Sequence, residues 1–106
     1  MKYESDRFVL GDAVEKEDVG GGVVRKIMGY NDSMMLVRVY FAENAVGYTH
    51  AHPHSQMAYV ESGVFAYTIG DDTKTLRACD CASVPPHAEH VAISREAAVL
   101  LDNFSA

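Results

Sequence analysis

Short apolar segments alternate with polar turns along most of this chain. Windows rich in Val, Ile, Leu, Met, Phe and Tyr are separated by Gly, Pro, Asn and Asp residues, and no window has a convincing 3.6-residue apolar period. This pattern predicts β-strands joined by tight turns. Many short strands at even spacing indicate an all-β barrel or jelly roll. The expected strands are 23–28, 34–41, 56–62, 64–69, 73–78, 82–84, 91–94 and 97–104, with a hairpin turn at 70–72.

The first 22 residues differ in character from the rest. They are polar and acidic except for an apolar patch at 8–10, and they end in three consecutive glycines at 20–22. No helix pattern follows these glycines, so we interpret them as a flexible joint and not as a phosphate-binding loop. We expect residues 1–22 to form an N-terminal arm, with a short edge strand at 8–10 exchanged with a partner subunit. Residues 23–106 are expected to form the barrel.

Composition narrows the class of protein. The chain has 106 residues, is 48% hydrophobic and carries a net charge of −6, which is typical of one globular domain and argues against nucleic-acid binding. There is neither a membrane-length apolar run nor a hydrophobic signal core, so no membrane partner and a cytoplasmic location are expected. Cys79 and Cys81 are too close along the chain for an unstrained disulfide, and we interpret both as buried thiols in a reducing compartment.

Histidines are concentrated in one stretch of the chain. On a strand, residues i and i+2 point to the same face, so His50 and His52 would aim two imidazoles in one direction. Pro53 ends the strand ladder and bends the chain, which returns Gln56 toward the pair. His90, after a double-proline turn, can supply a fourth ligand. A single histidine is more often a satisfied core or surface residue, but the combination predicts a metal site.

This ligand set constrains the chemistry of the metal. Three imidazoles and a carboxamide are neutral, so a divalent cation would keep its full charge. Ni, Zn, Mn, Fe and Co all suit such a site, and residue type does not choose among them. Four protein ligands leave two positions of an octahedral ion open, where an oxygen of a bound molecule can be polarised.

The histidine stretch resembles the first cupin motif, Gly-x₅-His-x-His-x₃₋₄-Glu-x₆-Gly. His50, His52, Gln56 and Gly63 match its later positions, with Gln56 where Glu is usual. The leading glycine of the motif is displaced. His54 forms a second His-x-His pair with His52 and is the alternative ligand. The number of residues from the His-x-His pair to Gln56 and to Gly63 fits the motif when His50 is the ligand, which leaves His54 as a surface or supporting group.

A second block, 80–90, resembles the second cupin motif. Cys79 stands in place of the glycine that usually precedes the aspartate, and His87 stands where a glycine is common. His90 matches the metal-binding histidine of this motif. His87 and Glu89 lie on the turn before it and are expected to be solvated rather than catalytic. The two matches span most of the chain and imply a single cupin-type jelly roll.

A closer resemblance is to the small single-domain cupins of the pectin-degradation type known as KdgF. That family opens cyclic 4,5-unsaturated uronates, from pectin or alginate, to linear keto sugars, and it binds a divalent metal through His, His, Gln and His. The resemblance therefore implies a uronate ligand, metal binding by the four residues above, and Asp102 and Phe104 near the catalytic group. The similar pieces are 22–29, 50–56, 59–60 and 102–105.

Three further side chains are candidates for the same reaction. Asp102 could be a proton shuttle if it faces the barrel mouth, although an aspartate at a strand end equally serves to cap a turn. Arg25 and Arg38 lie within apolar strands, and either could clamp a uronate carboxylate or lie on the solvated face. The family continues into a tail with a Pro and an Arg, whereas this sequence stops at Ala106. Arg25 or a partner subunit would have to compensate; otherwise the substrate differs or the activity is absent.

Two other functions fit the same residues. One is an Fe- or Mn-dependent cupin dioxygenase, although those proteins more often keep Glu at the position of Gln56. The other is a non-catalytic sugar-binding or sensing cupin. A homodimer is expected in each case, because the edge strands of a small open barrel need cover.

Overall fold

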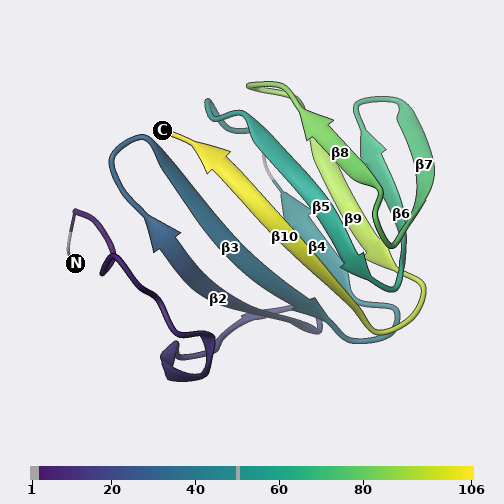
Figure 1. Ribbon diagram of the computed structural model, residues 1–106. Helices are drawn as coiled ribbons and strands as arrows, with labels where there is room; N and C mark the ends of the chain where they lie inside the picture. The colour runs from purple at the N-terminus through teal and green to yellow at the C-terminus, as the bar shows by residue number, and fades with distance from the viewer. Residues whose placement is uncertain (1–2, 50) are drawn as a thin grey trace.

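The computed structural model describes residues 3–49 and 51–106 as two antiparallel sheets packed face to face (Figure 1). The six-stranded sheet has the order β1-β2-β3-β10-β5-β8, and the four-stranded sheet has the order β4-β9-β6-β7. This confirms the all-β jelly-roll prediction. The strands are β1 Glu17–Gly20, β2 Val23–Tyr30, β3 Met34–Phe41, β4 Val46–Thr49, β5 Gln56–Ser62, β6 Val64–Ile69, β7 Asp72–Arg77, β8 Cys81–Val84, β9 His90–Ser94 and β10 Ala98–Ser105.

The N-terminal edge strand lies elsewhere than the sequence predicted. Residues 8–10 are irregular, with Phe8 and Leu10 exposed, and the short 3₁₀ turn Gly11–Ala13 follows them. The edge strand is instead β1, which pairs with β2 across the glycines at 20–22. All three glycines have positive φ, a conformation that glycine adopts without steric cost. The hairpin forms at β1 because this segment adjoins the turn.

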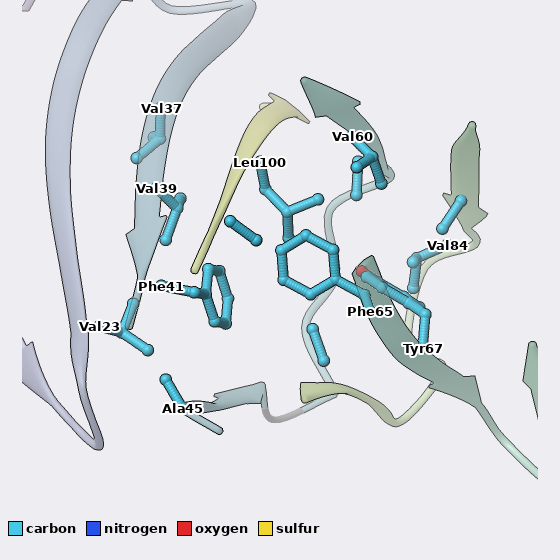
Figure 2. Packing of buried hydrophobic residues seen from close by; sticks show 14 residues of the cluster. Val23, Val37, Val39, Phe41, Ala45, Val60, Phe65, Tyr67, Val84 and Leu100 are labelled. Atoms are coloured by element: carbon cyan, nitrogen blue, oxygen red, sulfur yellow. The ribbon is translucent and has the colours of Figure 1, made fainter. Parts of the chain in front are cut away.

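The core lies between the two sheets. The rings of Phe41 on β3 and Phe65 on β6 meet edge to face, with 4.9 Å between their centroids, and Leu100 of β10 packs beside them (Figure 2). Gly47 lies against the Phe41 ring, and a Cβ atom there would be only 2.9 Å from that ring. The core therefore requires a residue without a side chain at the start of the histidine stretch.

Every second side chain of strand β10 points between the sheets, and this row of residues extends to the candidate site. Ala98, Leu100 and Asp102 are buried and point between the sheets. Asp102 pairs in register with Val37 of β3 and with Ala58 of β5, so it occupies the middle of the six-stranded sheet. An acidic side chain is thereby placed at the bottom of the space between the sheets.

The cysteines differ from the sequence prediction. Cys79 and Cys81 are both exposed, so the prediction of buried thiols is wrong: Cys79 lies on the turn before β8, and Cys81 points outward from that strand. Cys79 and His87 have φ values of 77° and 66°, so both keep a backbone conformation that favours glycine. No described helix is long and apolar enough to cross a membrane.

Candidate functional site

The candidate ligands come from two loops at one end of the barrel. The sequence predicted that His52 lies on a strand. Strand β4 instead ends at Thr49, so His52 lies on the loop that follows it. Gln56 is the first residue of β5 and His90 the first of β9. The backbone N–H of His87 donates to the carbonyl of His52 over 2.6 Å. This hydrogen bond joins the two loops.

Three side chains converge on one point. The Oε1 atom of Gln56 lies 3.1 Å from Nε2 of His52 and 2.8 Å from Nε2 of His90. The two imidazole rings are almost perpendicular, with centroids 5.1 Å apart. Gln56 and His90 are buried, while His52 is half-buried. Gln56 therefore returns toward His52 after the bend at Pro53.

Hydrogen bonds on the far sides of these groups fix where their protons lie. Nδ1 of His52 lies 3.0 Å from the carbonyl of His54, and Nδ1 of His90 lies 2.9 Å from the carbonyl of Ala88. A carbonyl only accepts, so each neutral ring carries its proton on Nδ1 and keeps a lone pair on Nε2. Burial lowers the pKa of His90, against a smaller opposite effect of the Ala88 carbonyl, which favours the neutral ring.

The carboxamide of Gln56 is oriented in the same way. Its Nε2 atom donates to Oδ1 of Asp102 over 2.9 Å, so Oε1 is turned toward the two imidazoles. Two nitrogen lone pairs and a carbonyl oxygen therefore face one another, which is repulsive unless a cation lies among them. Imidazole and carbonyl donors suit a divalent transition metal. The residues present fit the metal that the sequence predicted.

The fourth expected ligand, His50, lies outside the described residues. Within 3–49 and 51–106 there is no group of three or more His, Cys, Asp or Glu side chains arranged to hold a metal ion. The set that the structure brings together is His52, Gln56 and His90, of which only two are histidines. The ligand assignment of all four residues therefore stays a prediction.

Asp102 lies directly behind the candidate ligand Gln56. It is buried, and burial raises the pKa of its carboxyl to about 6, although the hydrogen bond from Gln56 and the nearby His52 ring act in the opposite direction. The Phe104 ring lies on the other side of the site, with its centroid 5.9 Å from that of His52. Both sequence-predicted residues of β10 thus lie beside the candidate ligands.

A cavity of about 380 Å³ runs between the sheets from this point. Its wall is mostly apolar, and its polar lining consists of Gln56, Tyr67, Asp102 and Arg25. Sites for small molecules commonly combine an apolar wall with a few convergent polar groups in this range of volume. Tyr67 carries no motif that marks it in the sequence. Its inward position follows from alternation with the buried Phe65 on β6, once the core-facing side of that strand is known.

The two candidate arginines point to opposite faces. Arg25 of β2 pairs in register with the buried Val39 and lines the cavity. Arg38 of β3 lies on the outer face, where it forms an ion pair with Glu61. Of the two, only Arg25 can reach a molecule in the cavity.

The remaining candidates lie outside the converging set. The ring of His54 is 5.6 Å from that of His52, and its buried Nδ1 has no hydrogen-bond partner among the described residues. His87 and Glu89 are exposed, in agreement with the expectation that they are solvated.

Two antiparallel sheets around an internal cavity, with imidazole and carboxamide groups converging at one end, define a single-domain cupin. The Cupin domain family matches residues 37–104. A pectin degradation protein KdgF from Dickeya dadantii (strain 3937) is 36% identical over 101 residues, which cover 93% of this chain and 92% of that protein. The chain therefore belongs to the cupin family and is a homologue of KdgF.

Solved structures agree with this assignment. The crystal structure of an RmlC-like cupin from Shewanella frigidimarina NCIMB 400 is similar with a TM-score of 0.94 and 40% identity, covering 98% of this chain and 94% of that one. The structure of KdgF from Halomonas sp. is similar with a TM-score of 0.89 and 31% identity, covering 95% and 94%. The similarity extends over nearly the whole chain in both cases.

Proposed function

We propose that this cupin opens the ring of cyclic 4,5-unsaturated uronates and converts them to their linear keto forms, as a metal-dependent isomerase of pectin or alginate breakdown. The observation that carries the proposal is the convergence of two imidazole lone pairs and the Gln56 carbonyl beside a cavity of about 380 Å³. A relative of high coverage is named for pectin degradation. A site with acceptor groups only and an adjoining pocket supports binding of a cation next to a small molecule.

The metal would be held by His50, His52, Gln56 and His90. When bound, it supplies Lewis-acid polarisation of a sugar oxygen. The chain itself holds the ligands in orientation: the carbonyls of His54 and Ala88 fix the two imidazoles, and Asp102 fixes the carboxamide. Such outer hydrogen bonds orient metal ligands and set their tautomers.

The reaction needs one proton to be moved. Ring opening breaks the bond between the anomeric carbon and the ring oxygen, and the anomeric hydroxyl gives up its proton as the aldehyde forms. The ring oxygen becomes the enol oxygen, and protonation of the neighbouring alkene carbon then gives the ketone. Atoms balance, because the proton removed from one oxygen is matched by one added to carbon.

Asp102 is our candidate for the group that carries this proton. Its side chain lines the cavity, with one carboxyl oxygen engaged by Gln56. Phe104 also lines the cavity beside His52, where its ring would pack against the sugar and exclude water. A positioned carboxyl with a pKa raised toward neutrality suits proton transfer in both directions.

The test is a direct assay on purified protein loaded with a divalent metal. We expect it to accelerate the loss of ultraviolet absorbance of the conjugated alkene in an unsaturated galacturonate or mannuronate monomer. Asp102→Asn, which preserves size and can still accept from Gln56, should lower the rate by 10²-fold or more, within the range of about 10²–10⁴ typical of acid–base groups. A wild-type rate equal to the spontaneous one in the presence of metal rejects the function.

The expected homodimer stays a prediction. Among the described strands, β1, β8, β4 and β7 lie at the ends of their sheets. Exposed sheet edges favour pairing with another chain unless they are covered. Light scattering on the purified protein is expected to give the mass of two chains.

A further inference from the structure

An ion pair lies at the mouth of the barrel cavity. Glu17 on β1 and Arg25 on β2 are partners in register, so their side chains lie on the same face of the hairpin. Nε and Nη2 of Arg25 lie 3.3 Å and 3.1 Å from the same carboxylate oxygen of Glu17. Arg25 lines the cavity, together with Val19 of β1. The pair thus links the edge strand to the cavity.

The pairing uses only one edge of the guanidinium. Nε and Nη2 form its side edge, and both point at Glu17. On the end edge, formed by Nη1 and the second N–H of Nη2, Nη1 has no polar contact with any residue in 3–49 or 51–106. Two parallel N–H groups on one edge match the two oxygens of a carboxylate. Glu17 therefore holds the guanidinium in orientation and leaves its second edge for another carboxylate.

The distance to Asp102 suits a small substrate. Arg25 lies opposite Val39 of β3, and Asp102 lies opposite Val37 of the same strand. The two residues are thus two strands and two positions apart, which places their Cα atoms roughly 12 Å from each other. Both residues line the same cavity. A monosaccharide can therefore reach both ends.

The charges in the cavity favour an anionic sugar at this end only. Arg25 is the one cationic side chain in the described lining, and most of the rest of the wall is apolar. The chain as a whole carries a net charge of −6, so its overall field does not attract an anion. Recognition of a carboxylate must come from a locally placed cation.

We propose that Arg25, oriented by Glu17, binds the carboxylate of the sugar and gives the cavity its preference for uronates over neutral sugars. This inference rests on the proposed function, since it concerns the same cavity. Arg25 touches the substrate in this scheme, whereas Glu17 is a positioning residue that acts through Arg25. β1 thereby belongs to the site although it lies outside the matched cupin segment, which begins at residue 37.

Calorimetry on the metal-loaded protein tests this with two saturated sugars that do not react, galacturonate and galactose. We expect wild type to bind galacturonate at least 10-fold more tightly. Arg25→Gln should remove that preference and leave galactose binding unchanged. Arg25→Lys keeps the charge but lacks the two parallel N–H donors of the guanidinium, so it should keep part of the preference. Arg38→Gln, on the outer face, is the matched control and should change neither affinity. A galacturonate preference that survives in Arg25→Gln overturns the proposal.

Glu17 is tested in the same assay. Glu17→Ala should weaken galacturonate binding about 3-fold, and in the Arg25→Gln background it should have no effect. Tighter binding in Glu17→Ala would mean that Glu17 competes with the substrate, and an effect that persists without Arg25 would mean that it acts by another route; either result overturns its positioning role.

Failure of this inference and failure of the proposed function give different results. If galacturonate binding depends on Arg25 but the unsaturated monomer is not converted, the ring-opening function is rejected and the carboxylate site is supported. If the monomer is converted and Arg25→Gln leaves both KM and kcat unchanged, the carboxylate site is rejected and the ring-opening function is supported. Circular dichroism of each variant confirms that it is folded before binding is measured.

Discussion

The contact between Gln56 and Asp102 explains why this cupin carries Gln where Glu is usual. Nε2 of Gln56 donates to Oδ1 of Asp102 over 2.9 Å, and both side chains are buried. In Gln56→Glu a carboxylate oxygen would take the place of that donor. Two carboxylates at hydrogen-bonding distance cannot both ionise, so the pair would keep a proton or separate.

The size of the effect follows from the lost interaction. A hydrogen bond to a charged group contributes about 1.5–3 kcal/mol, and a buried acceptor without a donor costs a similar amount. We expect Gln56→Glu to lower the free energy of unfolding of the metal-free protein by about 2–3 kcal/mol. This corresponds to a decrease in Tm of roughly 10–15 °C for a domain of this size.

The assay is thermal and urea unfolding of protein treated with a chelator, so that metal binding does not contribute. Asp102→Asn is the matched variant. By itself it should cost little, because its carboxamide oxygen still accepts from Gln56. Combined with Gln56→Glu it should recover most of the loss, because donor and acceptor have exchanged places.

The penalty in Gln56→Glu should also shrink as the pH is lowered, since the pair then takes up its shared proton. Two results would refute the reasoning: a Gln56→Glu protein as stable as wild type at neutral pH, or a double variant no more stable than Gln56→Glu alone.

Three further predictions concern the metal, the backbone and the pH dependence of stability. His52→Ala should lose bound metal, as measured by elemental analysis, and should no longer gain stability when metal is added, whereas His54→Ala should keep both properties; retained metal in the first variant would contradict the ligand assignment. His87→Gly should stabilise the fold by about 0.5–1 kcal/mol in urea unfolding, because φ at this position is 66°, and a destabilised variant would show that the side chain matters more than the strain. Burial raises the pKa of Tyr67 above its ordinary value of 10.0, so the folded state keeps a proton that the unfolded state loses, and stability should be complete below about pH 10 and fall as the pH rises further. Tyr67→Phe should reduce this alkaline loss, and a variant with the same slope as wild type would count against it.

The sequence by itself determined the class of fold and the contact between two of the candidate ligands. Alternation of apolar and polar residues placed eight of the strands, because a strand with one face on a core must repeat every two residues. The spacing of His52, Pro53 and Gln56 predicted a bend that returns the carboxamide toward the imidazole, and the structure shows that contact. These features depend on residues that are close together in the sequence, so they can be predicted from the sequence.

Tertiary structure alone decided which side chains face the cavity. Arg25 and Arg38 both lie in strands with apolar residues at neighbouring positions, because the outer face of the six-stranded sheet is itself partly apolar. Only the register with Val39 turns Arg25 inward, and only the opposite parity of β3 turns Arg38 toward Glu61. A shift of one residue would exchange the two faces, and that choice is made by packing across strands distant in sequence.

The same reason accounts for the other differences. The apolar patch at 8–10 has the composition of a strand, but the hairpin with β2 was formed by the segment adjoining the glycine turn. Cysteine is often buried, but Ala82 and Val84 take the core-facing positions of β8, so the alternation along this strand leaves Cys81 on the outer face. The type of a residue indicates whether it can be buried in a core. Which residues reach the core, and which reach the cavity, depends on pairings between segments that the sequence does not place side by side.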